Sequence, residues 1–255
     1  IPKASDQSYL SKILKISMNY DLVIPTTENE IYKISKYFKN NDNHKFLVNK
    51  FNIVKTFCNK KKASEFFYNF NFKTPQTFFH PKLIKKKIKQ VYCKPILGSG
   101  SKGHLILENN KFVENLNLKN YFYQEYIEYD KEYTCVLYQY SNTLRTIILE
   151  RQLKGGISYY VKIVNSIKIN KILKELSTII NLKGSINLQL CEKKNQIFIF
   201  EINPRLSSTV YVRHLLNFKD CLWWIKDKMK IKYKIDPISS KKRIAFRKYN
   251  EFYLD

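Results

Sequence analysis

Two spacings of apolar residues recur along the chain, and each predicts a different kind of element. A short apolar run over residues 20–27 ends in Pro and Thr, which predicts a strand. Helical spacing follows over residues 28–40 and 49–72, and again from about Ile169 to Ile180. Asn59 is placed to cap a helix in the second of these segments, because its short side chain can accept a hydrogen bond from a backbone N–H.

Strand patterns account for most of the remaining chain. Residues 91–107 predict a strand, a glycine-bearing loop and a second strand, and residues 121–140 and 146–153 continue the β pattern. Residues 183–206 predict a β-hairpin that turns near Lys193 to Asn195. Residues 242–255 predict a closing strand. The chain therefore mixes helices with strands that follow one another closely.

The hairpin carries the first candidate for chemistry. Glu201, Asn203 and Arg205 stand at every second position of FIFEINPR, so on a strand their side chains start out on one face. If the hairpin turns as predicted, Gln189 lies opposite or nearly opposite Glu201, and Asn187 shares its face. The other residues of the run are expected to pack against the opposite face: Phe198, Phe200 and Ile202.

Oxygen-bearing side chains that converge in this way suit magnesium. This ion prefers a few carboxylate or amide oxygens together with waters and substrate phosphates. The alternative is a pair of strands whose polar residues face solvent. Nucleotide chemistry becomes the better interpretation when the hairpin is taken together with a second feature, the glycine-bearing loop.

Half of the six glycines fall between Gly98 and Gly103, in a chain that is otherwise poor in glycine. Glycine is kept where a chain turns sharply or approaches a ligand closely, and successive free N–H groups in such a loop can hold phosphate oxygens. The alternative is an ordinary β-hairpin turn, since neither a Walker A loop nor a Rossmann fingerprint is present. Lys94, four residues before the loop, favours phosphate binding.

Composition limits the class of protein but does not identify its function. With 255 residues, 44% of them hydrophobic, the chain can bury a sizeable core in one large domain or two small ones. The net charge is +25, yet only six of the 46 basic residues are arginine. Drift toward AT-rich codons explains this pattern, and selected polyanion binding is the alternative. Either origin gives weak, salt-sensitive adhesion to nucleic acid.

The sulfur and imidazole side chains predict no zinc site and no disulfide framework. Five cysteines and four histidines are dispersed without a Cys-x-x-Cys pair, which fits free thiols in a reducing cytosol. No apolar run approaches the length that spans a bilayer, and the amino terminus has no hydrophobic signal segment. We therefore expect a cytoplasmic protein with no membrane partner.

Four motifs in order, KPILGSGSKG, QEYIEYDKEY, NLQL and FEINPRLSST, resemble the ATP-grasp superfamily, in the branch similar to the large subunit of carbamoyl-phosphate synthase. The resemblance runs from about Asn49 to the end. It implies an α/β (α+β) chain with a two-lobed ATP-grasp domain over residues 48–255. The lid lobe would span about 78–127 and the catalytic lobe about 128–255. Residues 1–47 would be the remnant of a truncated Rossmann-like pre-ATP-grasp domain whose first strands are absent, so that either a partner covers the exposed sheet edge or activity is impaired.

The resemblance also implies a role for individual residues. Lys94 and Arg205 would contact the phosphates of ATP during catalysis, and Glu132 would bind the ribose hydroxyls. The metal ligands for Mg²⁺ or Mn²⁺ would be Gln189, Glu201 and Asn203. The phosphate loop would comprise Gly98, Ser99, Gly100, Ser101, Lys102 and Gly103. The hinge that meets the adenine would comprise Gln124, Glu125, Tyr126 and Ile127.

The implied reaction is ligation of a carboxylate to an amine or related nucleophile through an acyl phosphate, with release of ADP and phosphate. Arg151 and Arg213 are candidate anchors for a small-molecule carboxylate, because a guanidinium matches a carboxylate bidentately; each is equally explained as a structural arginine. The resemblance favours a homodimer. Tyr129 departs from the pattern, which has glycine there, and other ATP-grasp enzymes have a carboxylate where this chain has Gln189.

Two alternatives remain open from the sequence. One is a degenerate ATP-grasp or a basic module that binds nucleic acid or anions without catalysis, supported by the charge and by the 15% aromatic content. The spread of lysine along the chain and the scarcity of arginine argue against it. The other is a kinase-like enzyme that stops at the phosphorylated product.

Overall fold

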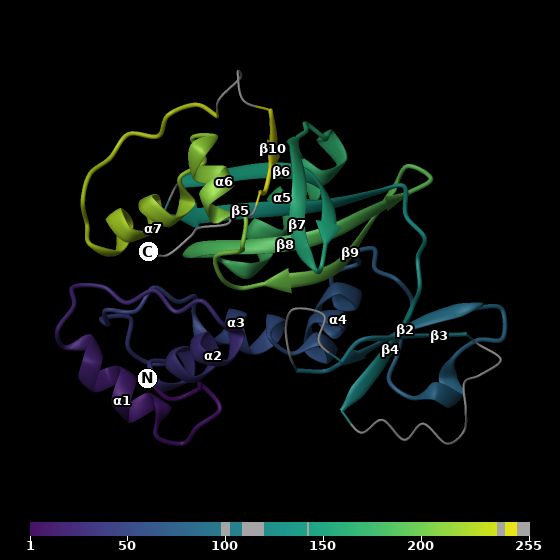
Figure 1. Ribbon diagram of the computed structural model, residues 1–255, viewed down its shortest axis with the longest axis horizontal. Helices are drawn as coiled ribbons and strands as arrows, with labels where there is room; N and C mark the ends of the chain where they lie inside the picture. Colours follow the sequence, from purple (N-terminus) through teal and green to yellow (C-terminus); the bar gives the residue numbers. More distant parts are fainter. Residues whose placement is uncertain (98–102, 109–119, 142, 239–242, 249–255) are drawn as a thin grey trace, which may run out of the picture.

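The computed structural model describes residues 1–97, 103–108, 120–141, 143–238 and 243–248. Its strands form two sheets, and Figure 1 shows the small sheet and the N-terminal helices lying below the large sheet. Every pairing between named strands is antiparallel. The fold is therefore mixed, with helices packed on antiparallel sheets.

The small sheet has the order β1-β4-β2-β3. Its strands are β1 (Thr77–Phe78), β2 (Gln90–Pro95), β3 (Leu105–Glu108) and β4 (Tyr121–Glu125). The large sheet has the order β10-β7-β6-β5-β8-β9. Its strands are β5 (Lys131–Tyr140), β6 (Thr143–Lys154), β7 (Ile157–Ile163), β8 (Gly184–Lys193), β9 (Gln196–Asn203) and β10 (Ile244–Phe246).

Helices precede the small sheet, interrupt the large one and follow it. They are α1 (Tyr9–Ser17), α2 (Glu28–Tyr37), α3 (Phe51–Phe57), α4 (Lys60–Asn69), the 3₁₀ helix Pro81–Leu83, α5 (Ile167–Ile180), α6 (Val210–Leu215) and α7 (Asp220–Lys228). Among the described residues, none of these helices is long and apolar enough to cross a membrane.

Side-chain caps fix where several helices begin. Thr27 and Glu30 form a reciprocal capping box at the start of α2, and Asn59 accepts a hydrogen bond from the Lys62 N–H at the start of α4. Ser166 caps α5 in the same way. The predicted cap at Asn59 is confirmed.

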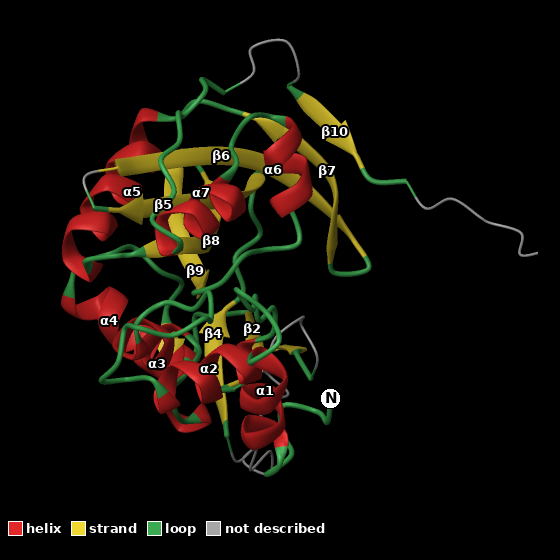
Figure 2. Cartoon of the chain, turned by 90° about the vertical axis from the view of Figure 1, so that its left-hand side faces the viewer, coloured by secondary structure: helices red, strands yellow, loops and turns green. Residues whose placement is uncertain are grey.

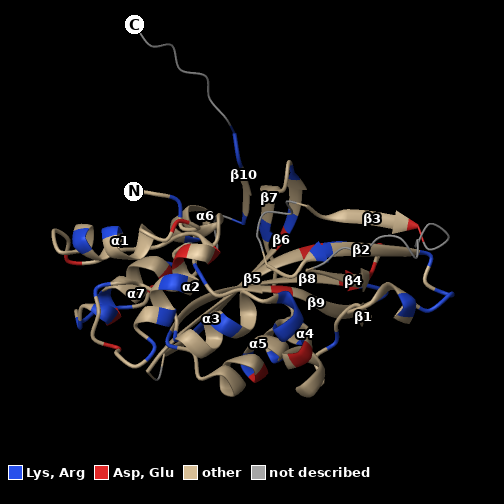
Figure 3. Ribbon diagram, turned by 90° about the horizontal axis from the view of Figure 1, so that it is seen from below, with Lys and Arg blue, Asp and Glu red and all other residues tan. Residues whose placement is uncertain are grey.

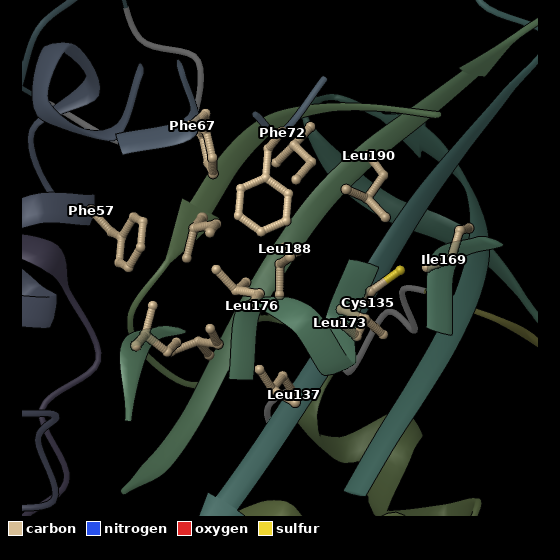
Figure 4. Close-up of a cluster of buried hydrophobic side chains, with 14 of the residues drawn as sticks. Phe57, Phe67, Phe72, Cys135, Leu137, Ile169, Leu173, Leu176, Leu188 and Leu190 are labelled. Atoms are coloured by element: carbon tan, nitrogen blue, oxygen red, sulfur yellow. The ribbon is translucent and has the colours of Figure 1, made fainter. Parts of the chain in front are cut away.

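One face of the large sheet is covered by α3, α4 and α5, and the main core lies there (Figure 4). Leu137 of β5, Leu188 of β8, and Leu173 and Leu176 of α5 are all fully buried in this layer. Burying one such leucine contributes about 1.5–3 kcal/mol, so this layer is a major source of stability.

The opposite face of the large sheet is divided between a second core and an open wall. Tyr138 and Val136 of β5 lie under α6 and α7, in a layer that includes Trp223 and Trp224 (Figure 2). Thr134 and Glu132 lie two and four residues before Val136, on the same face of β5. Alternation along β5 therefore turns polar side chains toward the space beyond the helices.

The β8–β9 hairpin turns at Lys194 and Asn195, which both have positive φ. Two consecutive residues with positive φ match the tight turn that suits antiparallel strands. Gln189 pairs directly with Glu201 across the hairpin. The turn and the register that the sequence predicts are both confirmed.

The predicted strand over residues 20–27 is wrong in extent. The structure has only an isolated parallel bridge there, between Val23 and Phe46. No further backbone pairing extends it in the described part of the chain, although Val23 packs with Phe46 in a small apolar cluster. The expected Rossmann-like remnant over residues 1–47 stays a prediction.

Candidate active site

A cavity of about 520 Å³ is lined by both sheets and by the chain that connects them. Its walls come from β2 and β4 of the small sheet and from β5, β6, β8 and β9 of the large one, with the loop after β9 at one end. Eleven of the residues predicted to form the site line it: Lys94, Gln124, Glu125, Tyr126, Ile127, Glu132, Arg151, Gln189, Glu201, Asn203 and Arg205.

Lys94 projects from β2 into this cavity as a desolvated cation. Its side chain is 7% exposed, and Nζ donates to Gln124 Oε1 over 2.7 Å. Nζ also lies 5.0 Å from the centre of the Tyr92 ring and 5.5 Å from that of Phe200. Burial lowers the pKa of Lys94 to about 8, although Glu201 opposes the shift. An anionic ligand would restore the favourable interactions that this ammonium has lost.

A β-bulge shapes the opposite wall. Gln189 pairs with Glu201, but the next residue of β8, Leu190, pairs with Ile199, so Phe200 is the extra residue. Phe200 and Glu201 therefore both line the cavity. The prediction that Phe198 and Phe200 pack the core is wrong. The residues of β9 that join the core are Ile197, Ile199 and Ile202.

The donor set on this wall fits a magnesium or manganese ion that brings phosphate with it. Gln189, Glu201 and Asn203 line one patch, and Asn187 pairs with Asn203 while accepting a hydrogen bond from Thr134. Among the described residues there is no cluster of three or more His, Cys, Asp or Glu side chains. One carboxylate with amides gives few charges, so phosphate oxygens and waters would complete the coordination.

Arg205 lies at the loop end of the cavity and is paired with a residue from far back in the chain. Its Nη2 donates to Glu28 Oε1 over 3.3 Å and its Nη1 to the Leu206 carbonyl over 3.2 Å. Its Nε is buried without an acceptor in the part of the chain that the structure describes. An unpaired buried donor is costly, about 1–3 kcal/mol, and an anion beside this guanidinium would lower that cost.

Glu28 brings a second carboxyl group close to Glu201. Burial raises the pKa of Glu28, the negative charge of Glu201 raises it further, and Arg205 and Lys60 oppose both effects. Glu28 and Glu201 therefore act electrostatically on three basic side chains around the cavity, those of Lys60, Lys94 and Arg205. A polyphosphate with its metal would suit this balance of charges.

Comparison with known proteins settles the family. A model of the ATP-grasp domain matches residues 57–209, which are 153 of the 255 residues. The chain belongs to the ATP-grasp family. The superfamily predicted from the four motifs is confirmed. The narrower likeness to carbamoyl-phosphate synthase stays a prediction.

Solved ATP-grasp structures share the fold at low identity. N5-carboxyaminoimidazole ribonucleotide synthetase from Thermus thermophilus is 12% identical, with a TM-score of 0.71 over 92% of this chain and 67% of that one. The corresponding synthetase from Staphylococcus aureus is 11% identical, with a TM-score of 0.69 over 89% of this chain and 65% of that one.

A third solved structure gives the same result. The biotin carboxylase domain of 2-oxoglutarate carboxylase from Hydrogenobacter thermophilus, solved with MgADP and bicarbonate, is 11% identical, with a TM-score of 0.73 over 88% of this chain. The chain spans 57–67% of the length of these three structures. The comparison with curated proteins found no match.

The segment predicted to be the hinge, Gln124 to Ile127, is already hydrogen-bonded to its neighbours. The Glu125 N–H donates to the Gln76 carbonyl over 2.8 Å, and the Tyr126 N–H donates to the Gln90 carbonyl over 3.0 Å. Gln124 bridges Lys94 and Thr77 through its side chain. These two backbone donors are therefore engaged, and an adenine would meet the carbonyl oxygens of this segment or the backbone of Ile127.

Glu132, predicted to bind ribose, is held by two protein side chains. Arg151 donates from Nε to Oε1 over 2.9 Å and adds a second bond from Nη2, while the Tyr129 hydroxyl donates to Oε2 over 2.7 Å. Tyr129 is the residue that departs from the family pattern. Because Arg151 is committed to Glu132, it is not a free anchor for a substrate carboxylate.

Arg213 does not line the cavity, so the prediction that it anchors substrate is wrong. It is completely buried and forms an ion pair of 2.8 Å with Asp220. Gly98, Ser99, Gly100, Ser101 and Lys102 of the predicted phosphate loop lie outside the described residues. Gly103 is described, with φ +73° and its carbonyl bonded to the Tyr121 hydroxyl, and it does not line the cavity.

Several cavity residues were not expected from the sequence. Tyr92 and Phe200 flank Lys94, Thr134 fixes Asn187, and Ser207 to Thr209 form the loop end. Period-two alternation from Glu132 would have placed Thr134 on the cavity face, so that signal was available. The pairing of Glu28 with Arg205 could not be predicted from a local sequence pattern, because the two residues are 177 positions apart.

Proposed function

We propose that this ATP-grasp chain is an ATP-dependent ligase that joins a small-molecule carboxylate to an amine or related nucleophile, with release of ADP and phosphate. The observation that carries the proposal is the convergence of Lys94, Arg205 and Glu201 on one cavity, where Lys94 is buried and the Nε of Arg205 is buried without an acceptor among the described residues. A triphosphate with its metal supplies the charge that this cavity lacks.

Each side chain has a defined task in this proposal. Lys94 and Arg205 bind phosphate oxygens and offset the negative charge that builds up on the transferred group. Glu201, with Gln189 and Asn203, holds magnesium or manganese, which when bound polarises the phosphate oxygens. Glu132 accepts a ribose hydroxyl on a lone pair that Arg151 and Tyr129 leave free.

The reaction proceeds in two displacements. An oxygen of the carboxylate attacks the γ-phosphorus, the bond to the ADP oxygen breaks, and an acyl phosphate results. The nucleophile then attacks the acyl carbon and phosphate leaves. The cavity residues assist mainly by position and charge, since phosphoryl transfer needs no covalent nucleophile from the protein.

A thermal-unfolding comparison tests the nucleotide site. Wild type and Glu201→Ala are heated with magnesium alone and with MgATP. Ligand at about 100 times its dissociation constant adds roughly 2.7 kcal/mol, a shift of several degrees in wild type that shrinks in the variant. No shift in wild type would contradict the proposal.

Product analysis after incubation with panels of carboxylates and amines separates ligation from a kinase-like outcome, because only ligation forms a bond between the carboxylate carbon and the nucleophile.

The described residues give no specific support to the alternative of a basic nucleic-acid module. Lys and Arg lie on most of the elements visible in Figure 3, rather than in one stripe. A binder that tracks phosphates would lose affinity steeply with added salt.

All five cysteines are free thiols, as expected for the cytoplasmic location that stays a prediction. A homodimer also stays a prediction, for which light scattering is the direct measurement.

A further inference from the structure

One buried amide joins the N-terminal part of the chain to both strands of the β8–β9 hairpin. Asn49 lies two residues before α3, which packs beside the end of β9 (Figure 1). It is 2% exposed, and its Nδ2 donates to the Ser185 carbonyl over 2.9 Å and to the Pro204 carbonyl over 3.0 Å. Ser185 belongs to β8 and Pro204 directly follows β9, so the amide connects the two strands at their open end.

The open end of the hairpin needs this connection because its own ladder stops there. The last pair between β8 and β9 is Asn187 with Asn203. Pro204 has no N–H to donate to β8, so it cannot extend the ladder. The chain then turns sharply, and the Arg205 N–H donates to the Asn203 carbonyl over 2.8 Å. This is a three-residue γ-turn, and Asn49 holds the carbonyl of its central residue.

A count of hydrogens fixes the orientation of the amide. A primary amide has two N–H hydrogens, and here each one meets a backbone carbonyl. In the flipped orientation Oδ1 would face both carbonyl oxygens, which repel it, so the two carbonyls select the donor orientation. Oδ1 is then buried without a donor in the part of the chain that the structure describes. Gly184 leaves room for it, because a Cβ there would lie 2.7 Å from Oδ1.

Stability alone does not explain this arrangement. A buried acceptor without a donor costs free energy, which offsets part of what the two donated bonds contribute. What the amide fixes is geometry, since its two bonds hold the turn at Pro204 against the start of β8. Asn203 and Arg205 stand on either side of Pro204, and both line the cavity. A shift of the turn would therefore move both of these side chains.

We propose that Asn49 is a positioning residue for the reaction. It does not line the cavity, and it acts by holding the turn so that Asn203 and Arg205 face the same phosphate group with its metal. Such placement matters because phosphoryl transfer depends mainly on position and charge. The inference rests on the proposed ligase function. It adds to the site a residue that precedes the segment matching the ATP-grasp model.

The test compares Asn49→Ser with wild type. Serine has one hydrogen to donate and a shorter side chain, so at most one of the two carbonyls stays bonded. We expect the affinity for MgADP, measured by titration calorimetry, to fall about tenfold. Circular dichroism checks that the variant is folded. Unchanged affinity in a folded Asn49→Ser would overturn the proposal.

A double-mutant cycle separates positioning from general damage. Asn49→Ser is also made in a background that lacks both positioned side chains, Asn203→Ala with Arg205→Ala. If Asn49 acts through these two residues, its substitution should change MgADP affinity by less than about twofold in that background. An equal loss in both backgrounds would show that Asn49 supports the cavity as a whole, and the proposal would be wrong.

Leu173→Ala is the matched control for stability. Leu173 is fully buried in the core on the face of the large sheet that does not carry the cavity, so its truncation opens a hole there. It should lower the urea midpoint at least as much as Asn49→Ser, while MgADP affinity stays within about twofold of wild type. If Leu173→Ala loses affinity as Asn49→Ser does, lost stability is the cause and the proposal is overturned.

Pro204→Ala tests the same idea from the other side of the contact. It keeps the carbonyl that Asn49 holds but removes the ring that fixes φ, so the turn is loosened without a change in the amide. We expect the same direction of effect on MgADP affinity, and this variant replaces Asn49→Ser if that protein does not fold. Full affinity in Pro204→Ala would show that the turn needs no holding. If wild type does not bind MgADP at all, the proposed function itself has failed.

Discussion

Arg205 donates a hydrogen bond to Glu28 over 3.3 Å, although 177 positions separate them in the chain. The contact joins the first turn of α2 to the loop that ends β9. A cavity residue of the ATP-grasp domain is therefore held in place by the N-terminal segment. This gives residues 1–47 a function in the site that does not depend on whether they are the remnant of a Rossmann-like domain.

Removing the charge of Glu28 should reduce catalysis by releasing Arg205. Glu28→Gln loses a hydrogen bond between charged groups, about 1.5–3 kcal/mol, and we expect kcat for ADP formation to fall about tenfold with a smaller change in KM. Steady-state ADP release measures both constants. Glu30→Gln on the same helix is the control, because it removes a carboxylate of α2 while the amide oxygen can still accept the Thr27 N–H, and it leaves Arg205 paired. Equal loss of kcat in both variants would contradict the role of Glu28.

The lowered pKa of Lys94 should appear as a pH dependence of nucleotide binding. With a pKa of about 8 in the free protein, the ammonium is lost as the pH rises through that value. Affinity for MgADP should therefore fall by about tenfold for each pH unit above 8. Lys94→Arg stays charged throughout, so its affinity should vary far less over the range. Titration calorimetry across this range measures both proteins.

The same group affects stability in the opposite sense. Because the folded pKa of about 8 lies below the ordinary lysine value of 10.5, the unfolded chain binds more protons between these values. The contribution of Lys94 to stability therefore rises with pH across this window. Lys94→Met should abolish that rise, as measured by the urea midpoint at each pH. A rise of equal size in the variant would assign it to other groups.

Glu201→Ala should abolish ADP formation while the fold stays intact. The side chain lies on the cavity face of β9, so its loss opens no hole in the core, but it removes the carboxylate from the three side chains proposed to hold the metal. ADP release and circular dichroism are measured side by side. Glu150→Gln changes a carboxylate of the same sheet outside the cavity, and it should leave turnover unchanged. Normal turnover in Glu201→Ala would show that the metal site has been assigned wrongly.

The sequence predicts the cavity well where local alternation decides the geometry. The two-residue turn sets Gln189 close to Glu201, and the bulge at Phe200 shifts the register by one residue so that the two pair directly. The placement of Lys94 follows from the strand before the glycine loop. The prediction from alternation that Phe200 packs the core failed, because a bulge inserts one extra residue in β9. The residues of β9 before the bulge therefore face the opposite side of the sheet from the side that simple alternation predicts. Nothing in the pattern of β9 alone marks that bulge.

Arginine roles were the least predictable part of the site. Arg151, Arg205 and Arg213 are each paired with a carboxylate, that of Glu132, Glu28 and Asp220 respectively. Which of them faces the cavity depends on tertiary packing, which local sequence does not encode. The missing strand at residues 20–27 has the same cause, because a strand needs a neighbour and only one bridge to Phe46 is formed.

The start of β8 offers a sharp test of the packing that supports the site. A Cβ on Gly184 would lie 2.5 Å and 2.6 Å from ring atoms of Trp224 and 2.7 Å from Asn49 Oδ1. Gly184→Ala must therefore push a buried indole out of place, and we expect a loss of about 3 kcal/mol in the free energy of unfolding from urea titration. Gly155→Ala is the control, because that glycine also has positive φ but nothing within 4 Å of its Cβ position, so only the backbone cost of about 1 kcal/mol applies. If the two variants lose equal stability, the clash with Trp224 is not the cause. If Trp224→Phe partly rescues Gly184→Ala, the indole is identified as the group that is displaced.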